Sequence, residues 1–381
     1  MDFTRSTEQR QIDEMVTEFV DEEVVPRAGK IDETDDFPRE LIDEMAQLGL
    51  LGMPFPEEYG GAGLDYHSYA LALAEISRGS GGLGTIVAAH TSLAGNMLYE
   101  FGDDTQKETY LTPLNEGRDI GAFALSEPGA GSDVPAMETT ARADGEEYVL
   151  NGNKLWISNG SVADTVVVFA KTDEDAGNRG ISSFVVRPDE DDGFHVEGTD
   201  PKLGDKGCPT AELRFDALRI PADRRLGAEG DGFVQALKTL NAGRITIAAR
   251  GVGIAQAALD AAVEYANERE QFGQSIGEFQ SIKHKIADMD TKLQAAKLLM
   301  HRAADLKMRG EDHIKAAAQA KLYASEVSRE VANEGIQIHG GYGYTTDFPV
   351  ERFYRDAKLN EIYEGTSEVL RNTIGDQVLD G

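Results

Sequence analysis

Hydrophobic residues near the start of the chain recur at the spacing of a helix. The run consists of Ile12, Met15, Val16, Phe19 and Val20. Residues three and four positions apart share one face of a helix, so the run predicts an amphipathic helix. The preceding segment Ser6-Thr7-Glu8-Gln9 has the pattern of a helix start with a capping hydroxyl. A second helix is predicted from Pro38, because proline is favoured in the first helical turn. Residues 66–78 and 86–101 complete a helical set, with a glycine-rich break from Gly79 to Gly84.

The pattern changes near residue 119 to short runs rich in β-branched and aromatic residues. The predicted strands are Ile120 to Leu125, Glu138 to Ala143, Tyr148 to Leu150, Thr165 to Ala170, Ile181 to Val186, and Glu212 to Phe215. Asp144-Gly145 and Asn151-Gly152 are strong hairpin signals. We therefore expect a compact antiparallel sheet or barrel in this part of the chain.

Long alanine-rich helical patterns return near residue 226. They cover Ile245 to Arg269, Ser281 to Arg309, and about Asp312 to Gly335. Helices of this length predict an antiparallel bundle. The predicted fold is α+β and mostly α, with an N-terminal helical domain (1–118), a middle antiparallel β-barrel or sheet domain (119–225) and a C-terminal four-helix bundle (226–381). A Rossmann domain is disfavoured, because no GxGxxG segment follows a strand.

Charge narrows the range of partners. The 381 residues carry 68 Asp and Glu against 37 Lys and Arg, a formal net charge of −31. Such a field repels nucleic acid and anionic membrane surfaces. Because the acidic excess is spread along the chain, we expect a halophilic protein whose self-repulsion is screened by salt.

Several classes of site and location are disfavoured by the composition. Cys208 is the only cysteine and the seven histidines form no HExxH pattern, so no metal site is expected. No segment has 18 unbroken apolar residues, and residues 1–5 lack the pattern of a signal peptide. We therefore expect a soluble, cytoplasmic protein.

The most informative residue is Glu364, in the run Ile362-Tyr363-Glu364-Gly365-Thr366. Glycine next to a carboxylate leaves room for a substrate to approach. In a dry site such a carboxylate has a raised pKa and can act as a general base. The alternative explanation is a glutamate at a helix end, followed by glycine as a helix breaker.

Four other segments carry candidate chemistry, and each also has a purely structural explanation. The loop Phe123 to Asp133 follows a predicted strand, and its glycines and hydroxyls could bind a ligand or form an ordinary turn. Trp156 is the sole tryptophan and could line a planar cofactor or fill the core. Arg269 could bind a pyrophosphate or stabilise a helix C-terminus. The segment Gln337 to Gly343 could approach phosphate or ribose, or simply end a helix.

Taken in order, these segments resemble the acyl-CoA dehydrogenase family of FAD-dependent flavoproteins over essentially the whole chain. The most specific pieces are LSEPGAGSD, LWISNG, REQFG, QIHGGYGY and IYEGTSEVLRN. The resemblance implies an oxidoreductase that converts an acyl-CoA thioester to a trans-2-enoyl-CoA in lipid or amino-acid catabolism. It further implies FAD, an electron-transferring flavoprotein as partner and a homotetramer.

The resemblance also implies which residues bind FAD. The flavin-ring group is Phe123, Leu125, Ser126, Gly131, Ser132, Trp156, Ile157 and Ser158. The pyrophosphate and adenosine group is Arg269, Phe272, Gln280, Gln337, Gly340 and Gly341, often supplied by a neighbouring subunit. Thr366, Ser367 and Glu368 would also approach the FAD. The sequence departs from the family at Ser126, where threonine is frequent, and the hydroxyl is kept.

By the same resemblance, Glu364 matches the catalytic base, which takes the α-proton while the β-hydrogen leaves as hydride to flavin N5. Ser132, Asn241, Arg244 and Gly365 match substrate-binding positions. A branch of the family carries its base at the position of Gly243. Since glycine cannot take a proton, the chain resembles the short- or medium-chain type.

Three alternatives remain open from the sequence. An acyl-CoA oxidase is disfavoured because oxidases are commonly much longer chains. A decarboxylating glutaryl-CoA-type enzyme would need a cation for the distal carboxylate, for which Arg78 and His90 are candidates. A non-catalytic flavin-fold assembly protein is disfavoured by the presence of Glu364. The acyl-chain length and branching are not specified by the sequence.

Overall fold

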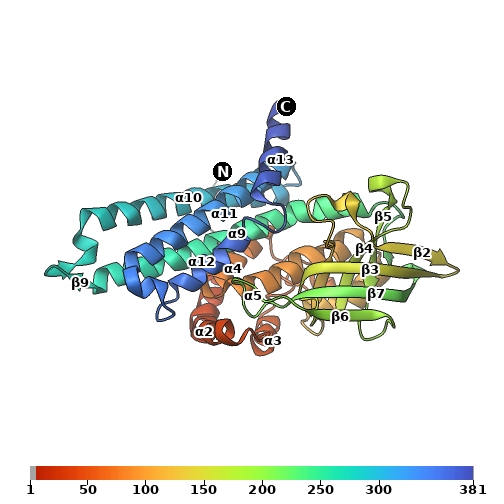
Figure 1. The fold of residues 1–381 in the computed structure, drawn as a ribbon, viewed down its shortest axis with the longest axis horizontal. Coiled ribbons are helices and arrows are strands. Elements are labelled where there is room, and N and C mark those ends of the chain that lie inside the picture. The colour runs from red at the N-terminus through yellow and green to blue at the C-terminus, as the bar shows by residue number, and fades with distance from the viewer. Residues whose placement is uncertain (1–5, 381) are drawn as a thin grey trace.

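A computed structural model describes residues 6–380 of the chain (Figure 1). The expectation about a signal peptide concerns residues 1–5 and lies outside this range. The N-terminal part is helical, as predicted. Its helices are α1 (Thr7–Phe19), η1 (Val20–Val24), α2 (Val25–Thr34), α3 (Arg39–Gln47), α4 (Tyr66–Gly79), α5 (Gly81–Val87), η3 (Ala88–Gly95), α6 (Asn96–Phe101), α7 (Asp104–Gln106), η4 (Lys107–Leu111) and α8 (Thr112–Asn115).

Two predicted helix starts lie where expected to within one residue, and the first has a side-chain cap. The Ser6 side chain accepts a hydrogen bond from the Gln9 backbone, and the Gln9 side chain accepts one from the Ser6 backbone, which forms a capping box. Helix α3 begins directly after Pro38. These local signals therefore fix where the first helices start.

The predicted glycine-rich break is wrong in detail. Gly82 and Gly84 lie inside α5, and the break is confined to Ser80, which ends α4 and caps α5. A Cβ on Gly82 would lie 2.1 Å from the Lys206 carbonyl oxygen, and one on Gly84 would lie 2.2 Å from Ser77 Oγ. The glycines are thus explained by close packing of a helix rather than by a loop.

The middle part forms one twisted sheet beside the helices (Figure 1). Its main path runs β6-β7-β3-β2-β4-β5-β8, and β1 pairs with β4. The strands are β1 (Gly121–Ala124), β2 (Thr140–Asp144), β3 (Glu147–Ser158), β4 (Thr165–Lys171), β5 (Ile181–Val186), β6 (Phe194–Thr199), β7 (Thr210–Pro221) and β8 (Arg225–Leu226). Most pairs are antiparallel, as predicted, but β4 pairs in parallel with both β1 and β2. The long β2–β3 hairpin supplies the crossover connection that a parallel pair needs.

One hairpin signal is confirmed and the other is wrong. Asp144-Gly145 joins β2 to β3, where Asp144 pairs with Glu147. Asn151-Gly152 lies inside β3, at a shift of register between Leu150 and Gly152. A Cβ on Gly152 would lie 2.4 Å from Thr139 Oγ1, so this glycine serves a β-bulge instead of a turn.

The C-terminal part is an elongated helical bundle (Figure 1). Its elements are α9 (Gly232–Glu268), β9 (Glu270–Gln271), β10 (Gln274–Ser275), α10 (Gln280–Met308), α11 (Ile314–His339), η9 (Gly340–Tyr344), α12 (Val350–Leu359) and α13 (Ser367–Leu379). Helix α9 begins well before the expected Ile245, and α13 projects from the bundle.

One hydrophobic core joins the N-terminal helices to the bundle. It contains Val16, Met45 and Leu73 from the first part together with Ile254 and Leu293 from the last. The two helical parts therefore stabilise each other. A second apolar cluster joins the N-terminal helices to the sheet, and a third lies mostly within the sheet. Within residues 6–380, no helix is both long and apolar enough to cross a membrane.

Candidate active site

Glu364 lies in the short segment between α12 and α13. Its φ is +50°, and that of Gly365 is +97°. A left-handed glutamate is unfavourable and persists only where its surroundings impose it. Directly after it, Thr366 caps α13 by accepting a hydrogen bond from the Val369 backbone at 3.3 Å. The backbone at Glu364 therefore continues neither α12 nor α13, and the residue lies in a tight turn between them.

The Glu364 carboxylate occupies the space in front of Gly243 on α9. A Cβ built on Gly243 would lie 2.3 Å from Glu364 Oε2 and 3.2 Å from Leu93 Cδ2. The Oε2 atom is buried and has no hydrogen-bond partner among the described residues. Glycine at position 243 is thus a requirement of space, because any side chain there would displace the carboxylate.

Burial sets the protonation of Glu364. Loss of solvent raises the pKa of this carboxyl to about 7, while the charges of Lys321 and Arg244 pull it down. A carboxyl with a pKa near 7 is about half ionised at neutral pH, and its ionised form is a stronger base than an ordinary carboxylate. The local environment therefore gives Glu364 the properties of a general base.

Arg244 places a buried guanidinium beside the base. Its Nη1 donates to Asn241 Oδ1 at 2.7 Å, whereas its Nε finds no partner within residues 6–380. Burial lowers the pKa of Arg244, and the attraction of Glu364 opposes that effect. A Cβ on Gly365 would lie 3.7 Å from Arg244 Nη2. Arg244 Nε and Glu364 Oε2 are thus both buried without a partner in the described chain, and such groups call for a water, ion or ligand.

Two predicted flavin-ring segments come together in the structure. The Leu155 backbone N–H donates to the Ser126 carbonyl at 2.9 Å. Below this contact, buried Lys154 donates to the Leu125 carbonyl at 3.2 Å and to Glu127 Oε1 at 2.7 Å. The loop after β1 and the end of β3 are therefore fixed to each other.

Trp156 has the geometry of a ligand-facing residue. Its side chain is 60% exposed, and its φ is +59°. The explanation of Trp156 as a core residue is therefore wrong. A large exposed aromatic residue with a strained backbone is typical of a functional site. Its neighbour Ile157 is buried, so the strand end is anchored while the indole ring stays open.

Leu93 links the base to the flavin-ring segments. It lies in the same apolar cluster as Phe123 and Leu125 and also borders the space between Gly243 and Glu364. Gly131 and Ser132 are exposed in the loop that follows β1. The catalytic candidate and the ring-binding candidates are therefore parts of one region between the sheet and the bundle.

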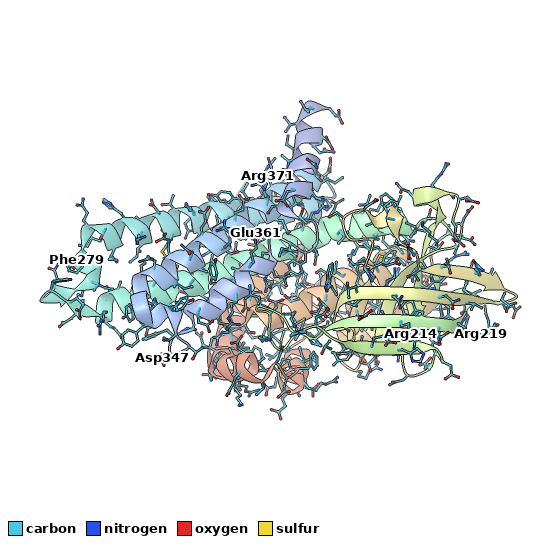
Figure 2. The ribbon with its side chains drawn as sticks, viewed as in Figure 1. Arg214, Arg219, Phe279, Asp347, Glu361 and Arg371 are labelled. Carbon is cyan, nitrogen blue, oxygen red and sulfur yellow. The ribbon has the colours of Figure 1, made fainter. Side chains whose placement is uncertain are left out.

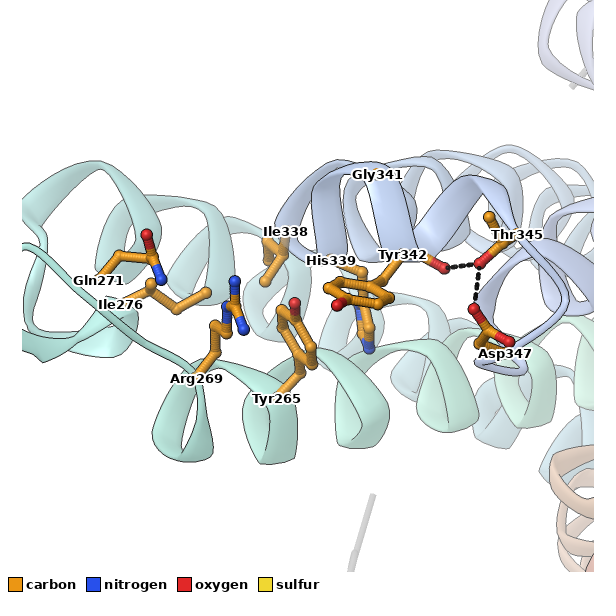
Figure 3. A pocket seen from close by; sticks show the side chains of 10 residues that line it. All are labelled: Tyr265, Arg269, Gln271, Ile276, Ile338, His339, Gly341, Tyr342, Thr345 and Asp347. Carbon is orange, nitrogen blue, oxygen red and sulfur yellow. Dashed lines mark hydrogen bonds between the residues drawn. The ribbon is translucent and has the colours of Figure 1, made fainter.

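The second predicted cofactor group lies elsewhere, at the end of the bundle. A cavity of about 510 Å³ is lined by residues of α9, α11 and the following turn (Figure 3). Arg269 and Gly341 line it, and the Arg269 guanidinium lies 5.7 Å from the ring centre of Tyr342. This end, marked by β9 in Figure 1, is opposite the sheet. One chain therefore does not bring the two predicted groups together.

Three buried charged residues that support these segments are not predicted from the sequence. They are Lys321, Lys154 and Glu127. Lys321 stands in an alanine-rich helical stretch, and a lone charge among small buried residues was the available signal. Glu127 and Lys154 lie within the quoted motifs, but only the fold shows that they pair.

Comparison with known proteins identifies the family. The chain matches the acyl-CoA dehydrogenase N-terminal domain over residues 6–118, the middle domain over 122–218 and the C-terminal domain over 230–379. It is 46% identical to a short-chain specific acyl-CoA dehydrogenase of Clostridium acetobutylicum, over 99% of this chain and 100% of that protein.

Solved structures support the same family. Butyryl-CoA dehydrogenase from Megasphaera elsdenii superimposes with a TM-score of 0.97 at 42% identity, with full coverage of both chains. A chain of the structure described as the electron transferring flavoprotein of Acidaminococcus fermentans superimposes with a TM-score of 0.99 at 45% identity, again over both full chains. PigA, solved with FAD and proline, superimposes with a TM-score of 0.96 at 31% identity and full coverage.

The expected family, fold class and enzyme class are confirmed by these matches. FAD, the expected cofactor, is confirmed at the level of the family. The residues present also fit this cofactor, since an exposed aromatic residue follows the contact between the two flavin-ring segments and a guanidinium lines the distant cavity. The chain belongs to the acyl-CoA dehydrogenase family, whose members dehydrogenate acyl-CoA thioesters.

Proposed function

We propose that this enzyme dehydrogenates a short acyl-CoA to its trans-2-enoyl-CoA, with Glu364 as the base that removes the α-proton. The observation that carries the proposal is the buried, unpaired Oε2 of Glu364, whose carboxyl has a pKa of about 7. Such an oxygen has no partner until a substrate supplies an acidic C–H. The short-chain specific relative supports a short acyl group as the first substrate to test.

Residues around the base bind and orient the thioester in this proposal. Gly365 lets the substrate approach, because it has no side chain next to the Glu364 carboxylate. Its positive φ is also accessible to glycine without strain. Arg244, Asn241 and Ser132 hold the acyl-CoA, with the unpaired Nε of Arg244 as a free donor within the described chain. Fixed positions for both base and substrate remove the entropic cost of bringing them together.

The flavin ring is proposed to lie against the loop after β1 and the end of β3. Bound FAD supplies the acceptor for the β-hydrogen as hydride. The chain contributes the ring-binding surface from Phe123, Leu125, Ser126, Gly131, Ser132, Trp156, Ile157 and Ser158. When the flavin ring covers Trp156, the indole excludes water from that side of the flavin. The buried Glu127–Lys154 ion pair keeps the loop in place.

The rest of FAD is proposed to bind across two copies of the chain. Arg269, Phe272, Gln280, Gln337, Gly340 and Gly341 lie at or near the far end of the bundle. Because this end is opposite the sheet, a second copy must supply it to the first copy's flavin. Thr366, Ser367 and Glu368 at the start of α13 are the remaining candidates. The expected homotetramer would satisfy this geometry.

The glutaryl-CoA alternative loses both of its candidate cations. Arg78 is paired with Asp21 and Glu75. His90 accepts a hydrogen bond from the Gly121 backbone at Nδ1 and lies 3.1 Å from the Leu114 carbonyl at Nε2, so it is neutral. Burial lowers the pKa of His90 to about 4. Neither residue is available to bind a distal carboxylate.

An electron-transferring flavoprotein is the proposed electron acceptor. The support is the match to a chain from the Acidaminococcus fermentans study of such a flavoprotein. A cytoplasmic location stays a prediction. The acceptor is tested by adding purified electron-transferring flavoprotein to the substrate-reduced enzyme and following reoxidation of its flavin.

The proposed reaction is tested by colour. The purified protein should be yellow, and butyryl-CoA should bleach the bound flavin under anaerobic conditions. A panel of straight-chain acyl-CoA thioesters, with isobutyryl-CoA and glutaryl-CoA, then ranks the substrates. Absence of bleaching by every member of the panel would contradict the proposed function.

A further inference from the structure

Lys321 contacts the backbone on both sides of Glu364. It lies on α11, and its side chain is fully enclosed. Its Nζ donates to the Tyr363 carbonyl at 2.8 Å and to the Gly365 carbonyl at 2.6 Å. Burial of an ammonium group is costly unless it is paired or hydrogen-bonded. The partners that compensate Lys321 are therefore the two carbonyls that flank the candidate base.

The same face of α11 holds the rest of the segment between α12 and α13. Ser325, one turn after Lys321, donates to the Asn360 carbonyl at 2.9 Å. Further along, Arg329 pairs with Glu361, which Figure 2 labels in this segment. A row of donors on one helix thus follows the chain from residue 360 to 365. Lys321 is the member of the row that reaches Glu364.

The backbone at this point needs an external restraint. Glu364 has a left-handed φ of +50°. A non-glycine residue returns readily to right-handed or extended conformations unless its neighbours prevent it. Two hydrogen bonds from one buried ammonium fix the peptide groups on either side of the residue. They therefore fix the direction in which the carboxylate points.

Lys321 also acts on the charge of the base. The charged groups that face it are Glu364, Arg244, Glu361 and Glu368. Burial lowers the pKa of Lys321 to about 7, the carboxylates oppose this, and Arg244 adds to it. In return, Lys321 is the largest influence that lowers the pKa of Glu364 against the effect of burial. Loss of the ammonium would therefore favour the protonated, inactive carboxyl.

We propose that Lys321 is a positioning residue for catalysis, which holds the carbonyls beside Glu364 and keeps the carboxylate ionised through its charge. It acts through Glu364 and does not itself take the substrate proton. The inference rests on the proposed role of Glu364 as the base.

Two substitutions separate the two effects. Lys321→Met removes the charge and both hydrogen bonds at similar length, whereas Lys321→Gln removes the charge and keeps an amide donor. The FAD-loaded variants are mixed with butyryl-CoA in a stopped-flow instrument, and flavin reduction is followed from acid to alkaline pH. Lys358→Met is the matched control, since Lys358 lies near the same segment but pairs with Glu361 at the surface.

We expect Lys321→Met to keep FAD and to slow flavin reduction at neutral pH by about 10-fold to 100-fold. In both Lys321 variants, the pH at half-maximal rate should move upward by about one unit, because the charge is lost. The rate at high pH should be better preserved in Lys321→Gln than in Lys321→Met. Lys358→Met should keep the wild-type pH profile.

A wild-type pH profile in both Lys321 variants would overturn the inference. The inference would also be overturned if the rate of flavin reduction fell only in proportion to lost FAD or lost thermal stability. That result is expected of a lysine with a purely structural role. Where Lys321→Met does not fold, Lys321→Gln decides the question through its pH profile. Retained flavin reduction in Glu364→Gln would instead contradict the proposed function, so the two failures are distinguishable.

Discussion

At the scale of single residues, a glycine and a glutamate share one space. Gly243 leaves room for the Glu364 carboxylate, and the resemblance to the family implies a base at one of these two positions. From the sequence, Glu364 was the preferred base because glycine cannot take a proton. The structure adds that a side chain at 243 and the present position of Glu364 exclude each other. The identity of residue 243 therefore controls the geometry of residue 364.

Gly243→Ala tests this exclusion. The added methyl group would lie 2.3 Å from Glu364 Oε2, so the carboxylate must move. A misplaced base should lower the rate of flavin reduction by roughly 10²-fold, with FAD still bound. The control is Gly375→Ala on α13, where no atom of the described chain lies within 4 Å of the new Cβ. Equal rates for Gly243→Ala and the control would contradict the assigned geometry.

At the scale of elements, Arg250 on α9 joins parts of the chain that are distant in sequence. It is fully buried, forms an ion pair with Asp205 and donates to the Gly81 carbonyl at 3.1 Å. The Asp205 backbone in turn donates to Asp356 Oδ1 on α12 at 2.6 Å. Burial raises the pKa of Asp356 to about 6, and the nearby Asp205 adds to this. One guanidinium thus holds α5, α9, α12 and the loop after β6.

Arg250→Met should destabilise the fold. Removing the guanidinium leaves buried Asp205 without its ion-pair partner, which costs about 3–5 kcal/mol. Urea unfolding measures the loss, and Arg371→Met is the control. Arg371 pairs with Glu326 at the surface, where Figure 2 labels it, and such a pair contributes at most about 1 kcal/mol. A similar loss for both variants would argue against the buried network.

Features of the elements that depend on neighbouring residues could be predicted from the sequence, and features that depend on contacts with other elements could not. Local signals predicted the cap at Ser6 and the Asp144-Gly145 hairpin correctly, because neighbouring residues decide those structures. The glycines at 82, 84 and 152 were misinterpreted as breaks or turns. Each of them is required by an atom of another segment, in Lys206, Ser77 and Thr139 respectively, so the pattern of neighbouring residues could not show the reason. The contacts of Lys321 could not be predicted for the same reason.

At the scale of the whole molecule, the two candidate cofactor regions are separate: one lies between the sheet and the bundle, and the other lies at the far end of the bundle (Figure 1). The division into domains at residues 118 and 225 stays a prediction, since the first and last parts share a core. A complete FAD site is proposed to need a second copy. This arrangement makes cofactor binding and assembly depend on each other.

Mixing two inactive variants tests the shared site. Arg269→Ala should lose FAD, and Glu364→Gln should keep FAD but lack the base. In a mixed assembly, a chain with intact Glu364 can receive Arg269 from its neighbour. We therefore expect coexpression to restore part of the flavin reduction. No restoration in assemblies shown to contain both chains would contradict a site shared between copies.

The acidic surface predicts a dependence on salt. The net charge is −31, so the excess carboxylates repel one another in dilute buffer, and salt ions screen that repulsion. The midpoint of thermal unfolding should rise by roughly 5 °C or more between about 0.1 and 2 M KCl. A midpoint that stays constant or falls over this range would contradict the halophilic expectation, which stays a prediction.

The most direct test of the account is the pH dependence of flavin reduction by butyryl-CoA in a single turnover. The base must be ionised to take a proton, and the pKa of Glu364 is about 7. The rate should therefore rise with pH, reach half its maximum near pH 7 and level off above it. Glu364→Gln at equal flavin content should be slower by roughly 10²-fold to 10⁴-fold at every pH. Near-wild-type reduction in that variant would contradict Glu364 as the base.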